Sequence, residues 1–247
     1  MNCPAEFEAK TTVNPWSLAG MGGLIWIISA LVGSDILKSF LPPKDWADVY
    51  GFIEKFTLAL CLIGFIMAIG ISIPAVLRNW WENKTKHLQI VFKYFIIYAG
   101  FMILVVGILV AIFILLEKMG GINPSIITNL ARDTNSNDTI TQLKVILKKS
   151  IPHFALSLFT MCILAPVIEE IFFRRFLFVA LRKKMNFAIS LFISSISFMA
   201  VHPNMALGAI GGIYLGYVYE KGKSLPANIL IHSAVNLATI TISMVIM

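Results

Sequence analysis

Runs of about 20 apolar residues recur along the 247-residue chain, and they constrain its fold more than any other feature. A helix rises about 1.5 Å per residue, so about 20 apolar residues are needed to cross the hydrocarbon layer of a membrane. Hydrophobic residues make up 58% of the chain and charged residues 13%, and the mean hydropathy is +0.83. This balance lies far from that of soluble globular domains. We therefore expect an all-α, polytopic transmembrane helical bundle of about seven to eight helices. The apolar runs lie at roughly 17–40, 56–77, 94–116, 151–181, 186–202, 205–220 and 225–246.

The positive charge of the chain indicates contact with a membrane surface rather than binding to nucleic acid. Its formal net charge of +7 comes from basic residues in connections between apolar runs, such as the segment 78–93 and the turn Arg182–Lys184. Basic connections tend to lie on the cytoplasmic side of a membrane. We therefore expect a multi-pass protein of the cell membrane that contacts the lipid bilayer and no nucleic acid. Its N-terminus would lie inside, and the connection 117–150 and the C-terminus would lie outside, although that connection carries basic residues as well.

The polar residues inside apolar runs are concentrated near the C-terminus. We expect residues 1–150 to form N-terminal transmembrane helices and an interfacial connection, and residues 151–247 to form a four-helix core. The first fifteen residues carry two acidic residues and one lysine, unlike the basic leader of a cleaved signal peptide, so we expect the first run to be retained. The connection contains an apolar pattern typical of an amphipathic helix on the membrane surface, at Ile140, Leu143, Ile146 and Leu147.

The sequence ILAPVIEEIFFRRFLF places four charged residues inside an apolar run, where each unpaired charge costs about 3 kcal/mol or more. On a helix, Glu170 and Arg174 share a face, whereas Glu169 points about 100° away from Glu170. One carboxylate can therefore be paired while the other remains free. Pro166 predicts a bend just before the glutamates, because it removes a backbone hydrogen bond. The alternative is that Arg174 and Arg175 pair with both glutamates as a packing device.

Two later apolar runs each carry a histidine with a partner four residues away. Phe198 and His202 share a helix face in FMAVH, and His232 and Asn236 share one in HSAVN. Taken alone, such a histidine is commonly interfacial, and such a His/Asn pair commonly links neighbouring helices. All these polar groups would be costly facing lipid. We therefore expect them to converge with the glutamates on one polar cavity inside the membrane.

The run between the two histidines contains glycine at every fourth residue. In LGAIGGIYLGYV, the residues Gly208, Gly212 and Gly216 form a ridge of small side chains along one helix face. Such a ridge lets two helix backbones approach closely. We expect these glycines to serve helix packing.

The three polar motifs, in this order, resemble those of the CPBP intramembrane proteases, which include the CAAX prenyl proteases and the bacteriocin-processing and Abi proteins. EEIFFR matches the motif E-E-x-x-x-R, FMAVH matches F-x-x-x-H, and HSAVN matches H-x-x-x-N, over about residues 165–240. The resemblance implies a helical bundle with a water-filled conical cavity. It also implies that the four-helix core at 151–247 is a CPBP-type catalytic core.

The resemblance further implies a role for each motif residue. Glu169 would act as general base on a water with the help of His202, and His232 and Asn236 would supply the oxyanion hole. The second glutamate and the arginine of the first motif would shape the site. Many bacterial members have glycine where this chain has Arg175, a departure at the cavity rim. The predicted site residues are Glu169, Glu170, Arg174, His202, His232 and Asn236.

The same residue types could also bind zinc, because two histidines and one glutamate can leave a fourth position open. However, the chain has no H-E-x-x-H motif, and its two motif histidines lie on different apolar runs. Its cysteines, Cys3, Cys61 and Cys162, are too far apart for a C-x-x-C site. We therefore expect no metal and no other cofactor.

The predicted function is that of a glutamate-dependent intramembrane endopeptidase. It would hydrolyse a peptide bond of a membrane-associated peptide or protein substrate, prenylated or leader-bearing, with a base and oxyanion donors. The main alternative is a non-proteolytic membrane scaffold that retains the fold and regulates a partner membrane protein, such as a sensor kinase or a secretion system. A proton-coupled transporter is a third reading, but its site would lie between two related halves, and the first three runs offer no counterpart to the last four.

Overall fold

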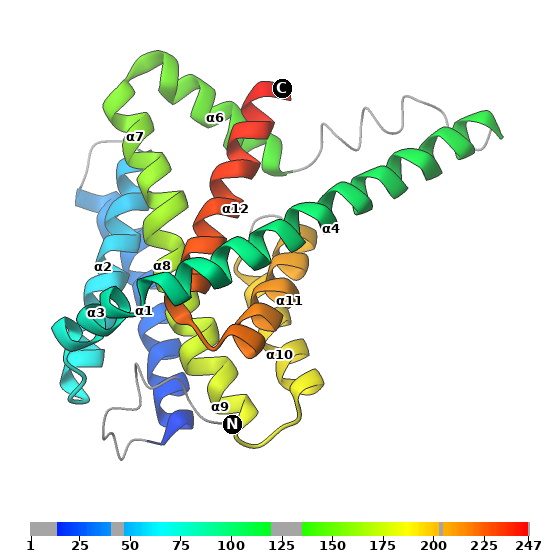
Figure 1. The fold of residues 1–247 in the computed structure, drawn as a ribbon. Coiled ribbons are helices and arrows are strands. Elements are labelled where there is room, and N and C mark those ends of the chain that lie inside the picture. Colours follow the sequence, from blue (N-terminus) through cyan, green and yellow to red (C-terminus); the bar gives the residue numbers. More distant parts are fainter. Residues whose placement is uncertain (1–13, 41–46, 120–134, 203–204, 247) are drawn as a thin grey trace.

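The protein is helical throughout the part of the chain that the structure describes (Figure 1). The computed structural model describes residues 14–40, 47–119, 135–202 and 205–246. The predicted all-α class is confirmed for these residues, which contain no strand. The retained first run was predicted partly from residues 1–13, which lie outside the described residues. The helices of the N-terminal part are α1 (Pro15–Phe40), α2 (Ala47–Ala68), α3 (Ile73–Glu82), α4 (Lys84–Lys118) and α6 (Asn135–Lys149).

The C-terminal part begins with one long helical rod from Ile151 to Arg182. Two segments of this rod are π-helical, with the wider turns that often occur near functional sites. The rod consists of α7 (Ile151–Phe159), η2 (Thr160–Leu164), α8 (Ala165–Glu170), η3 (Ile171–Phe178) and α9 (Val179–Arg182). It is followed by α10 (Phe187–Ala200), α11 (Met205–Gly222) and α12 (Leu225–Ile246).

Four stretches of the described residues are long and apolar enough to cross a membrane: Val49–Ala68, Lys84–Leu104, Ile151–Arg182 and Leu225–Val245. They support the prediction of an all-α membrane bundle. The apolar helix α10 has 14 residues, fewer than the roughly 20 that a full crossing requires. The helix nevertheless lies where the run 186–202 was predicted, and its crossing of the membrane stays a prediction.

The membrane span predicted over residues 56–77 was wrong, because one helix ends and another begins inside this run. Gly70 adopts a left-handed conformation with φ of 85°, which ends α2. The hydroxyl of Ser72 then accepts a hydrogen bond from the Ala75 N–H at 3.4 Å, and Pro74 occupies the first turn of α3. Both are ordinary signals of a helix start. The membrane-spanning stretch therefore begins earlier and ends at Ala68.

The long rod packs its charged middle section inside an apolar shell. Phe176 and Phe178 of η3 are 1% and 0% exposed and belong to a core shared with α1 and α2. Leu62 and Ile66 supply the α2 side of this core. This packing fixes the rotation of the rod and turns the opposite face, which carries the glutamates, toward α10, α11 and α12.

The glycine ridge of α11 lies against α10. A Cβ added at Gly212 would lie 3.0 Å from the Cα of Ser195 and 3.1 Å from its carbonyl oxygen. A Cβ added at Gly208 would lie 2.9 Å from the Cβ of His202. The separation at Gly208 is shorter than real Cβ contacts, and those at Gly212 would force Ser195 to shift, so the small residues allow the two helices to approach. Gly212 and Gly208 therefore serve the helix packing predicted for them.

The helix α4 is attached to the bundle through its first turns. His87 lies 2.7 Å from the Ser224 hydroxyl at the start of α12, and the hydroxyl of Tyr214 donates to the carbonyl of Tyr94. Figure 1 shows the C-terminal half of α4 extending beyond the other helices. Its exposed apolar residues there, such as Ile103 and Leu104, suit contact with lipid.

The amphipathic helix predicted in the connection is present as α6. Ile140 and Leu143 are buried and pack near Cys162 of η2 and Ile240 of α12. Leu147, which belongs to the same predicted apolar face, is 40% exposed. The helix therefore covers the end of the bundle at which α12 ends, as Figure 1 shows.

Candidate active site

The predicted site residues come from three separate elements and meet around one cavity. Glu169 lies on α8, His202 follows the last residue of α10, and His232 and Asn236 lie on α12. All four line a cavity of about 310 Å³. Tyr98 of α4 closes one side, and the remaining wall is formed mainly by α11, α12 and the start of α6. The cost of leaving polar groups in lipid is thereby avoided for all four residues.

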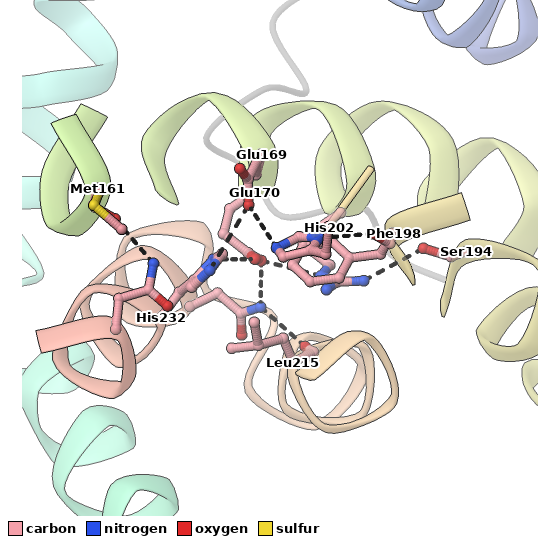
Figure 2. Close-up of polar contacts among 11 residues, drawn as sticks. Met161, Glu169, Glu170, Ser194, Phe198, His202, Leu215 and His232 are labelled. Carbon is pink, nitrogen blue, oxygen red and sulfur yellow. Dashed lines mark hydrogen bonds and ion pairs between the residues drawn. The ribbon is translucent and has the colours of Figure 1, made fainter. Parts of the chain in front are cut away.

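The carboxylate of Glu169 faces both histidines. Its Oε2 atom lies 3.5 Å from the Nε2 atom of His202 and 3.8 Å from the Nε2 atom of His232. Glu169 is 9% exposed, so this small group of polar atoms is largely screened from bulk solvent. Figure 2 shows the Glu169 carboxylate above the two imidazole rings, with dashed lines to both.

His202 is held in place by Phe198, one helical turn earlier. The Nδ1 atom of His202 lies 2.7 Å from the Phe198 carbonyl oxygen. Because a carbonyl only accepts, Nδ1 carries the proton, and Nε2 of the neutral ring presents its lone pair to the cavity. The Phe198 ring also stacks on the imidazole, with centroids 4.1 Å apart and planes inclined by 29°. Phe198 thus fixes both the tautomer and the orientation of His202.

Glu170 is buried behind the cavity in a dense set of hydrogen bonds. Its carboxylate is fully buried and accepts hydrogen bonds from Arg174 Nε at 3.0 Å, Asn228 Nδ2 at 2.8 Å and His232 Nδ1 at 3.0 Å. Arg174 is also fully buried, and its Nη1 donates to the Ser194 hydroxyl at 3.4 Å. The sequence-based pairing of Glu170 with Arg174 is therefore present, and Glu169 is left out of it.

His232 receives its orientation from this buried carboxylate. Since Nδ1 donates to Glu170, the Nε2 atom of the neutral ring presents a lone pair toward Glu169. Both histidines thus turn Nε2 toward the same carboxylate oxygen. A proton on one of the rings, or a water donating to several of these acceptors, would satisfy the arrangement.

Asn236 contacts the long rod and also lines the cavity. Its Nδ2 atom donates to the main-chain carbonyl of Met161 in η2 at 2.9 Å, a contact drawn in Figure 2. A side-chain amide carries two N–H groups, so this bond uses one of them. The predicted oxyanion role of Asn236 would have to use the other.

Two polar residues that support the site, Asn228 and Ser194, were not predicted from the sequence. Asn228 is fully buried and donates to Glu170 and to the Leu215 carbonyl, the latter at 2.9 Å. A signal was available, because Asn228 lies four residues before His232 and shares its helix face. Ser194 likewise lies four residues before Phe198, on the face that carries the second motif.

The cluster also contains a set of atoms able to hold a cation. One ligand atom from each of Glu169, His202 and His232 lies within 4.8 Å of the others. Each imidazole donates its Nδ1–H to an oxygen, as metal-binding histidines commonly do. These residues would fit a divalent cation, an arrangement that ligand spacing in the sequence disfavoured.

The fold and the site together define a membrane protein with a carboxylate–imidazole centre in a largely apolar cavity. Residues 151–238 match the family model described as type II CAAX prenyl endopeptidase Rce1-like. This segment, which includes every predicted site residue, is similar to the CAAX-type endopeptidases that the family model describes. Comparison with curated proteins gave no match, and comparison with solved structures gave none.

Proposed function

We propose that the protein is a glutamate-dependent endopeptidase of the cell membrane with several membrane crossings. Its substrate would be a membrane-associated peptide or protein of the prenylated or leader-bearing kind. The observation that supports this proposal most directly is the approach of two imidazole Nε2 atoms to one carboxylate oxygen of Glu169, at 3.5 and 3.8 Å. Such a centre can hold and deprotonate a water molecule.

In the proposed reaction, a water molecule binds between Glu169 and His202. It donates one hydrogen bond to the carboxylate and another to the Nε2 lone pair of the imidazole. Glu169 takes a proton from this water as the oxygen attacks the carbonyl carbon of the substrate.

His232 would stabilise the negative charge that develops on the substrate oxygen. When its Nε2 is protonated, the ring donates toward the cavity while Nδ1–H remains bound to Glu170. The buried carboxylate of Glu170 orients the ring through this hydrogen bond, as a paired acidic group does in other hydrolases. One positioned donor of this kind typically contributes about 100- to 1,000-fold in rate.

The final step breaks the bond between carbon and nitrogen. The proton held by Glu169 passes to the departing amine nitrogen, and the carbonyl forms again as the C–N bond breaks. The first products are a carboxylic acid and an amine, and Glu169 returns to its ionised state. The acid then gives its proton to the amine, which leaves a carboxylate and an ammonium group. Water supplies both the oxygen and the protons, so this scheme requires no cofactor.

The test is a comparison of membrane proteomes between cells with the native protein and cells with Glu169→Gln. We expect a membrane-associated precursor to accumulate in the variant and its shortened product to disappear. Glu54→Gln is a matched control, because Glu54 lies on α2 near Lys55 and does not line the cavity. Identical proteomes in all three strains, with normal protein levels, would favour the scaffold function instead.

A further inference from the structure

The carbonyl of Met161 is an unusual acceptor for a residue in the middle of a helical rod. In a regular α-helix it would bind the N–H of residue 165, four positions later. Here the Ala165 N–H bonds instead to the Thr160 carbonyl, five positions before it. The next donor available to Met161 in this wider π-helical spacing would be residue 166.

Residue 166 is Pro166, which has no N–H. The Met161 carbonyl is therefore left without a main-chain donor by two linked features, the π-helical turn and the proline that follows it. An unpaired buried carbonyl is costly, and more so at membrane depth. Asn236 removes this cost by donating its Nδ2–H at 2.9 Å.

This contact ties α12 to the section of the rod that carries Glu169. Pro166 lies three residues before Glu169, and Asn236 lies one helical turn after His232. The hydrogen bond between Asn236 and Met161 thus lies one turn from the 3.8 Å approach of His232 Nε2 to Glu169 Oε2. A shift of α12 along the rod would break the hydrogen bond and change that approach together.

We propose that Asn236 is a positioning residue, which acts through the carbonyl that Pro166 leaves free and thereby sets the separation of His232 from Glu169. This inference rests on the proposed function for its effect on catalysis, but the anchoring contact itself does not. In this inference, the proline before the glutamates frees a main-chain acceptor for a side chain from another helix. It also differs from a role in which Asn236 contributes only as a donor to the substrate oxyanion.

The test is a double-mutant cycle between Asn236→Leu and Pro166→Ala. Leucine is close to asparagine in size but cannot donate to Met161. Alanine at position 166 restores an N–H, so the rod can satisfy its own carbonyls in either helical spacing. If the amide of Asn236 serves the free carbonyl, its loss matters in the native chain and matters much less after Pro166→Ala.

Thermal unfolding of the purified protein in detergent tests the anchor without any substrate. We expect Asn236→Leu to lower the unfolding midpoint by about 2 to 8 °C in the native background, because it leaves a partly buried acceptor unpaired. In the Pro166→Ala background, the same change should lower it by about 1 °C or less. If Asn236→Leu alone does not fold, recovery of folded protein in the double variant supports the anchor, and failure to recover overturns it.

Cleavage of a quenched fluorogenic peptide with a farnesylated cysteine, in detergent micelles, tests the positioning role. Asn236→Leu should lower kcat about tenfold or more while KM changes about twofold or less, and Pro166→Ala should restore most of the lost kcat. Equal losses of kcat in both backgrounds would overturn the positioning role. If the native protein does not cleave this peptide, the proposed function is weakened for that substrate, whereas the thermal cycle still decides the anchor.

Asn228→Leu provides a matched control in the same helix. Asn228 is a second asparagine of α12, fully buried where Asn236 is half-buried, and it donates to Glu170 and to the Leu215 carbonyl rather than to η2. Its replacement should cost the same stability with Pro166 or with alanine at position 166. A rescue of Asn228→Leu by Pro166→Ala as large as that of Asn236→Leu would overturn the inference, because the effect would then be general stabilisation.

Discussion

Glu170 accepts a hydrogen bond of 3.0 Å from the Nδ1 atom of His232, and this contact separates the environments of the two adjacent glutamates. Glu170 is fully buried and also pairs with Arg174 and Asn228. Glu169 makes no such contacts with these residues and faces the cavity and the Nε2 atoms of both histidines. Adjacent residues of the same type therefore lie in different environments, which agree with the proposed roles of Glu170 as a fixed charge and Glu169 as a base.

Removing the charge of Glu170 should weaken the fold as well as the activity. In Glu170→Gln, the fully buried guanidinium of Arg174 would lose its ionised partner. Loss of one member of a buried ion pair typically costs about 3 to 5 kcal/mol. Thermal unfolding in detergent measures this change, with Glu54→Gln as the control for an acidic residue outside the network. A Glu170→Gln protein as stable as the native chain would show that Arg174 has another effective partner.

Removing the charge of Glu169 should affect activity alone. Glutamine has nearly the same shape but cannot accept a proton from water, so cleavage should fall by about 100- to 10,000-fold. The unfolding midpoint should change little, because glutamine can still hydrogen-bond to the two imidazoles that face this position. The measurement combines peptide cleavage with thermal unfolding on the same preparation. Full cleavage by folded Glu169→Gln would refute its assignment as the base.

The fold class could be predicted from the sequence, but the boundary between α2 and α3 could not be placed by hydropathy alone. The apolar run 56–77 continues through Gly70, although the glycine and the Ser72–Pro74 start signal end one helix and begin another. The run 186–202, by contrast, lies close to the bounds of α10. Average hydropathy does not register a change of backbone conformation, whereas glycine, serine and proline do.

In the candidate site as well, side chains could be predicted from the sequence, whereas the state of the backbone could not. Motif spacing brought Glu169, His202 and His232 to attention, and the cost of intramembrane charge predicted their convergence. Asn228 could have been found from its four-residue spacing to His232. The Met161 carbonyl could not, because any residue has a carbonyl, and its availability depends on the helical spacing around Pro166. Backbone acceptors of this kind become visible only in three dimensions.

The close packing of α10 and α11 predicts that Gly212→Ala destabilises the protein. The added methyl would lie 3.0 to 3.2 Å from atoms of Ser195, including its backbone, which cannot move freely. Overpacking of this kind typically costs about 1 to 3 kcal/mol. Gly100→Ala on α4 is the control, because nothing lies within 4 Å of its Cβ position, and alanine there should be neutral or stabilising. Equal unfolding midpoints for the two variants would contradict the packing inferred for α11.

Phe198 is predicted to matter both for stability and for catalysis. Its ring lies against His202, with centroids 4.1 Å apart, and the guanidinium carbon of Arg174 lies 4.9 Å from the same ring centroid. Phe198→Leu keeps an apolar side chain but removes the stacking and cation–π contacts, at a cost of about 1 to 3 kcal/mol. The kcat should fall as well, because the orientation of His202 is no longer fixed. Phe192→Leu on the same helix is the control, since Phe192 is 65% exposed and should tolerate the change.

The last prediction concerns the ligand atoms of Glu169, His202 and His232, which all lie within 4.8 Å of one another. The same atoms can hold either a reactive water or a divalent cation, and the proposed mechanism uses the water. We therefore expect peptide cleavage to persist after treatment with a strong zinc chelator, and the purified active protein to contain far less than one metal ion per chain by mass spectrometry. Glu169→Gln is the control for effects of the chelator that do not involve the site. Its residual rate should not respond to metal, so any loss of that rate would report damage to the protein as a whole. Loss of cleavage on chelation with full recovery on adding zinc would instead assign the water activation to a metal, with Glu169 and the two imidazoles as its ligands.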